Sequence, residues 1–80
     1  MEKSKEALLA EERKLKKLRR LVDLVSALLW QSNFTLGEAQ ELVTHAREIV
    51  LELFPDKGET FDLIYATRFR RILAEKYHLQ

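Results

Sequence analysis

Apolar residues recur at steps of three and four along most of this chain, and that spacing leaves few folds open. The clearest run is Leu36, Ala39, Val43, Ala46, Val50 and Leu53. Such steps place side chains on one side of an α-helix, whereas a half-buried strand needs strict alternation. Two glycines and one proline also supply few of the turns that a sheet requires. The sequence therefore predicts an all-α protein.

The first break in the helical pattern lies at residues 32–35. Thr35 and Glu38 have the T-x-x-E spacing of a capping box, in which each side chain accepts a hydrogen bond from the other residue's backbone N–H. Phe34, just before the cap, is placed to pack onto Ala39 as a hydrophobic staple. A helix is therefore predicted to begin at residue 36.

The second break lies at residues 54–59. Pro55 disfavours helical geometry at the residue before it, and Gly58 tolerates a positive φ. Eighty residues are enough for one small domain, residues 1–80, but not for two. Three helices are predicted, at about residues 4–31, 36–54 and 60–77.

The predicted first helix has an unusually broad apolar surface. A flank formed by Leu21, Leu24 and Leu28 widens its later half, which predicts contact with two neighbours. In the third helix, aromatic residues such as Phe61 and Phe69 face one way and would fill a small core. The main seam of the first helix consists of Leu8, Leu15, Leu18, Val22, Val25 and Leu29.

The predicted first helix is also longer than its neighbours. It would span about 40 Å, and each of the others about 27 to 29 Å. Because the connection at 32–35 is tight, the second helix must fold back and end near residue 12 of the first. Residues 1–11 then overhang the bundle, although they include Ala7-Leu8-Leu9-Ala10. Either this segment frays, or it packs against another copy of the chain.

We favour packing against another copy, because a chain this short without cysteine gains much from a partner's apolar surface. Symmetric pairs are the commonest closed arrangement. The prediction is an antiparallel three-helix bundle with an elongated N-terminal helix that dimerises. Its predicted function is that of a small helical interaction or assembly module, acting as a homo-oligomer and open to a protein partner. The predicted interface residues are Leu8, Leu9, Leu15, Leu18 and Val22.

The net charge of +1 is unevenly distributed along the chain. Residues 1–31 have eight basic and five acidic side chains, residues 32–54 one and four, and residues 55–80 five and four, giving +3, −3 and +1. We expect the acidic middle segment to balance part of the positive charge of the first helix within the fold.

The densest basic stretch is RKLKKLRR, residues 13–20. Its leucines project onto the apolar seam and four of its basic side chains onto the opposite face, so a solvated helix back is the favoured interpretation. The alternative function is binding of a nucleic-acid phosphate backbone through the first and third helices. A role at a membrane surface is weaker, because the leucines are needed for packing. The residues that would contact phosphate are Arg13, Lys16, Lys17, Arg20, Arg68 and Arg71.

No residue pattern indicates catalysis or a cofactor. Neither glycine belongs to a phosphate-binding loop, and no serine, histidine and carboxylate have a catalytic spacing. Glu41, His45 and Glu48 share a helix face suited in principle to a metal, but exposed groups of this kind are more often solvated. The sequence predicts a protein that is not an enzyme, without cofactor or metal. Because there is no cysteine, signal-peptide core or membrane-spanning run, the predicted location is the cytoplasm.

Overall fold

Three helices form the fold, and no strand occurs among the residues, 2–79, that this computed structural model describes. The predicted all-α three-helix class is therefore confirmed. The predicted boundaries lie within about two residues of the observed ones, except that the third helix begins at Pro55 and not near residue 60. The elements are α1 (Glu2–Gln31), α2 (Leu36–Leu53), and a third helix made of η1 (Pro55–Lys57), α3 (Gly58–Thr60), η2 (Phe61–Tyr65) and α4 (Ala66–Lys76).

The third helix contains a π turn that the sequence analysis did not predict. In η2 the backbone N–H of Ala66 donates to the carbonyl of Phe61, five residues earlier. A regular helix would separate Phe61 and Phe69, eight residues apart, by about 80°. The wider turn takes up one additional residue, which brings the two rings onto the same face. Both are buried, with ring centroids 5.9 Å apart.

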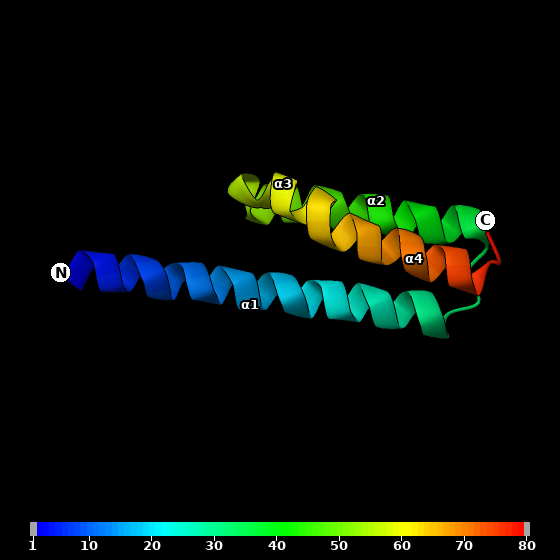
Figure 1. The fold of residues 1–80 in the computed structure, drawn as a ribbon, viewed down its shortest axis with the longest axis horizontal. Helices are drawn as coiled ribbons and strands as arrows, with labels where there is room; N and C mark the ends of the chain where they lie inside the picture. Colours follow the sequence, from blue (N-terminus) through cyan, green and yellow to red (C-terminus); the bar gives the residue numbers. More distant parts are fainter. Residues whose placement is uncertain (1, 80) are drawn as a thin grey trace.

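The molecule is a rod, 51 × 20 × 19 Å. In Figure 1, α2 and the third helix lie along the later part of α1, and the first part of α1 projects beyond them. A hydrogen bond from Lys57 to Glu11 marks the level at which the bundle ends. Residues 4–10 are all exposed. The predicted overhang is confirmed, and it is helical from Glu2; Met1 lies outside the described residues.

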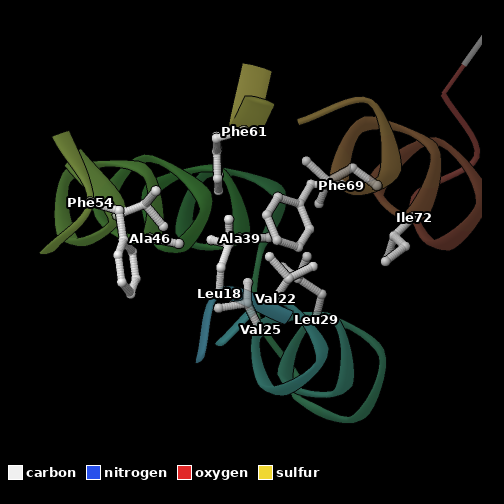
Figure 2. Packing of buried hydrophobic residues seen from close by; sticks show 12 residues of the cluster. Leu18, Val22, Val25, Leu29, Ala39, Ala46, Phe54, Phe61, Phe69 and Ile72 are labelled. Carbon is white, nitrogen blue, oxygen red and sulfur yellow. The ribbon is translucent and has the colours of Figure 1, made fainter. Parts of the chain in front are cut away.

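The core consists of apolar side chains contributed by all three helices, and Figure 2 shows them converging. The four seam residues of α1 that lie beside the other helices are buried, including Leu18 and Val22, which were predicted to lie in a dimer interface. Among the described residues no polar or charged side chain is buried. The buried residues are Leu18, Val22, Val25, Leu29, Ala39, Ala46, Val50, Phe54, Phe61, Phe69, Ile72 and Leu73.

Polar contacts fasten the end of α4 to the connection between α1 and α2. The Tyr77 hydroxyl donates to the carbonyl of Phe34 over 2.6 Å. The ammonium group of Lys76 donates to the carbonyls of Leu29 and Ser32. The carbonyls of Leu29 and Ser32 lie where α1 ends and lack helical partners, so Lys76 satisfies groups that would otherwise need water.

Gly58 has a different role from the predicted one. Its φ is −59°, in the right-handed helical region, so the expectation that it provides a positive φ is wrong. A Cβ atom at this position would lie 2.8 Å from Cδ2 of Leu51. The glycine instead lets the third helix begin close against α2.

The capping box predicted at the start of α2 is present. The backbone N–H of Glu38 donates to Oγ1 of Thr35 over 3.2 Å, and the N–H of Thr35 donates to Oε1 of Glu38 over 3.0 Å. These bonds satisfy two backbone donors that the helix itself leaves free. They fix where the chain leaves the turn and therefore the direction in which α2 returns along α1.

We expect Thr35→Ala to lower the free energy of unfolding by about 0.5 to 2 kcal/mol, because one capping acceptor is lost. The measurement is urea unfolding followed by circular dichroism. Thr44→Ala is the control, since the Thr44 hydroxyl only donates to the Gln40 carbonyl within α2. Equal unfolding midpoints for the two variants would contradict this role of the cap.

The same box makes part of the stability depend on pH. The hydrogen bonds from the backbone and the hydroxyl of Thr35 lower the pKa of Glu38. A carboxylate with a lowered pKa stabilises the fold fully above its ordinary pKa of about 4.3. That contribution is lost as the pH falls through the lowered value. Thr35→Ala removes the hydroxyl but keeps the N–H, so the pKa of Glu38 should rise only part of the way back.

Candidate protein interface

The five residues predicted to form a dimer interface lie in two environments. Leu18 and Val22 are buried in the core of their own chain, and Leu15 is half-buried. Leu8 and Leu9, on the overhang, are 67% and 44% exposed. Of the five, only the overhang leucines are largely open to another molecule. An interface on α1 must therefore draw on residues outside the main seam.

The flank of α1 beside α2 supplies such residues. Asp23 pairs with Arg68 of the third helix over 3.2 Å, so the Asp23 side of α1 faces α4. Leu24 and Leu28 project onto the other flank of the buried seam, beside α2. They are 58% and 37% exposed, and Leu21 next to them is half-buried. The predicted contact of α1 with two neighbours is present, because α1 packs against both α2 and α4, but Leu24 and Leu28 remain exposed beside them.

The flank of α2 beside α1 is apolar and exposed in the same way. Arg47 pairs with Asp62 of η2, which places the Arg47 side of α2 against the third helix. Ile49 and Leu53 project onto the opposite flank, toward α1, and are 43% and 62% exposed. Leu42, on the same flank, is half-buried.

These two flanks together form what we name the α1–α2 face. Exposed basic side chains border it on α1, where Lys17 precedes Leu21 by one helical turn. Exposed acidic side chains border it on α2, where Glu52 follows Ile49. The apolar members of the face are Leu21, Leu24, Leu28, Leu42, Ile49 and Leu53.

In the described part of the chain, the ion pairs between elements do not join the basic side chains of α1 to the acidic side chains of α2. We expected the acidic α2 to balance the basic α1. Within residues 4–79, however, the acidic members of the ion pairs between elements belong to α1 and η2. None of them joins residues 13–20 to a glutamate of α2. The three pairs are Lys57 with Glu11, Arg47 with Asp62 and Arg68 with Asp23.

Two of these pairs shift the pKa values of their members. Arg47 donates two hydrogen bonds to Asp62, over 2.8 and 3.0 Å, which lower the pKa of Asp62 and raise that of Arg47. The hydrogen bond to Glu11 raises the pKa of Lys57. Both members of the Arg47–Asp62 pair are nearly half exposed, so this pair orients the elements more than it stabilises them.

The six residues proposed for phosphate contact do not share one surface. Arg68 and Arg71 line a cleft of about 480 Å³ between α1 and α4. Lys16 lines a separate depression on α1, next to Arg19. The remaining three project away from the α4 side of α1. They are Arg13, Lys17 and Arg20.

Carboxylates line the α1–α4 cleft together with its arginines. Asp23 and Glu75 are part of its wall, and Asp23 pairs with Arg68. Trp30, in the last turn of α1, is 48% exposed and lines the same cleft. A polyanion in this cleft would meet negative charge as well as positive, which opposes its binding.

His45 lies beside Glu48, with Nδ1 of the ring 3.4 Å from a carboxylate oxygen. Both side chains are about two thirds exposed. Across the described residues, no three histidine or carboxylate groups are gathered as a metal would need.

Comparison with protein-family models, with curated proteins and with solved structures gives no match to this chain. None of the helices in residues 2–79 is both long enough and apolar enough to cross a bilayer.

Proposed function

We propose that this chain is a small assembly module, two copies of which form a homodimer through a surface of α1 that the chain itself leaves uncovered. One observation carries the proposal. The chain exposes 6184 Å², whereas a compact monomer of 9.5 kDa exposes about 5,050 Å². The excess, roughly 1,100 Å², exceeds the roughly 800 Å² that each partner contributes to a standard interface.

The shape and chemistry of the exposed surface support the same proposal. The radius of gyration is 14.7 Å, against about 11.6 Å for a compact chain of this length. Large apolar side chains are exposed along α1 from Leu8 to Trp30. Contiguous apolar surface in water favours association. A chain that is short for an independent core gains stability when a partner covers that surface.

Light scattering on the eluting peak of a size-exclusion column tests the proposal. At tens of micromolar chain, we expect a mass twice the 9.5 kDa of one chain. Dilution should shift the peak toward the single-chain mass. A mass of one chain throughout the series would overturn the proposal.

Phosphate binding is the alternative function, and the structure favours it less because Asp23 and Glu75 line the cleft that holds Arg68 and Arg71. It requires binding to mixed-sequence DNA or RNA that weakens as salt rises, with a log-log slope of about 0.7 to 0.9 for each phosphate contact. An unchanged electrophoretic mobility of a mixed-sequence duplex at low salt would exclude it.

A further inference from the structure

We propose that the two copies meet through the α1–α2 face, with α1 of each copy lying over α2 of the other. The two-fold axis then runs parallel to the helices. This inference rests on the proposed homodimer and adds the surface and the relative orientation of the copies.

The apolar content of the α1–α2 face makes it a better candidate for the dimer interface than the overhang. Four large apolar side chains of this face are exposed, and they come from two adjacent helices. The overhang offers Leu8 and Leu9, which project about 100° apart and are surrounded by charge. Stable interfaces have a contiguous apolar centre with a polar rim. Among the described surfaces, the α1–α2 face has that composition.

A second copy fits this face because the face is complementary to itself in charge. Its α1 side belongs to a segment of net charge +3, and its α2 side to a segment of net charge −3. Within residues 4–79, Lys17 and Glu52 form no ion pair. In a symmetric dimer each copy supplies both sides, so each basic border can meet an acidic one.

Charge also selects between the two ways of placing one such face on another. A two-fold axis across the helices would put α1 on α1 and α2 on α2, and so bring the acidic borders of the two α2 helices together. An axis along the helices puts the basic border of α1 over the acidic border of α2, twice in the dimer. Like charges at an interface oppose association, whereas complementary ones fix the register.

The level of each residue along the rod identifies the pair that would meet. Lys57 reaches Glu11 at one end, and the turn joins residue 31 to residue 36 at the other. Because the two helices are antiparallel, Lys17 lies level with the last turns of α2, near Glu52. Rotation about an axis along the helices leaves the position of each residue along the rod unchanged. Lys17 of one copy therefore lies opposite Glu52 of the other, and Leu28 lies opposite Leu42.

The first part of the test removes the apolar centre of the face. We expect Leu24→Asp and Ile49→Asp each to weaken dimerisation roughly a hundredfold, because each change occurs twice in a desolvated centre. Both side chains are exposed in the single chain, so circular dichroism should show unchanged helix content. Sedimentation equilibrium gives the dissociation constants. Leu8→Asp and Leu9→Asp are the comparison and should leave the dimer intact.

The second part tests orientation through charge reversal. Lys17→Glu and Glu52→Lys should each weaken dimerisation about tenfold, by replacing two attractive pairs with two repulsive ones. The double variant restores both pairs and should regain most of the wild-type affinity. Lys16→Glu and Glu75→Lys make the same charge changes away from the face and should have little effect.

The outcomes separate this inference from the proposed function. A wild-type chain that is monomeric overturns both. A dimer that survives Leu24→Asp and Ile49→Asp but dissociates with Leu8→Asp overturns the α1–α2 face and leaves the homodimer standing. Single charge reversals that weaken the dimer without rescue in the double variant overturn the orientation.

Discussion

Phe69→Ala should lower the free energy of unfolding by about 3 to 5 kcal/mol, the cost of removing a buried ring and leaving a cavity. Phe69 has no exposed surface and packs against Phe61 at the junction of the three helices. An 80-residue domain has only about 4 to 12 kcal/mol to lose. We therefore expect most of the variant to be unfolded at moderate urea concentrations, as measured by circular dichroism.

Leu63→Ala provides the control for this loss. Leu63 belongs to the same helix but is 69% exposed, so its truncation should change the free energy of unfolding by about 0.5 kcal/mol or less. Similar unfolding curves for the Phe69 and Leu63 variants would mean that the π turn does not bring Phe69 into the core.

Leu18→Ala should lower the free energy of unfolding by about 2 to 5 kcal/mol, whereas Leu8→Ala should change it little. The two leucines lie on the same helix, but Leu18 is fully buried and Leu8 is 67% exposed. Chemical unfolding at one fixed chain concentration gives the comparison. A large loss in the Leu8 variant would show that the overhang is covered by something in solution and would contradict the placement of the dimer on the α1–α2 face.

Local signals in the sequence predicted the helices well. The capping box at Thr35 and Glu38 involves residues three apart, so its geometry follows once a helix begins there. The end of α2 could also be predicted locally, because Pro55 disfavours helical geometry at the residue before it. The overhang of residues 1–11 could be predicted from the lengths of the helices and the tight turn at residues 32–35. These features depend on neighbours in the sequence and need no knowledge of tertiary packing.

Features that depend on how the helices are rotated against one another could not be predicted in this way. The interpretation of Gly58 was wrong because its constraint comes from Leu51, across a helix junction. Asp23 pairs with Arg68, which lies 45 residues later in the sequence. The π turn aligns Phe61 with Phe69, and no local motif marks it.

The candidate interface was predicted only in part. The leucine flank on α1 predicted contact with two neighbours, and α1 contacts both α2 and α4. Leu24 and Leu28 are the leucines of that flank that remain exposed. The seam residues Leu18 and Val22 were assigned to the dimer because a seam alone does not reveal which helix covers it. In the structure their own chain buries them.

Disulfide cross-linking between two different single-cysteine variants tests most directly that α1 of one copy lies over α2 of another. The chain has no cysteine, so each introduced thiol is unique. One variant has Lys17→Cys and the other Glu52→Cys. After mixing under mild oxidation, we predict a covalent dimer that contains one chain of each kind, with little product from either variant alone. Efficient linking of Lys17→Cys to itself, or no covalent dimer in the mixture, would contradict the account.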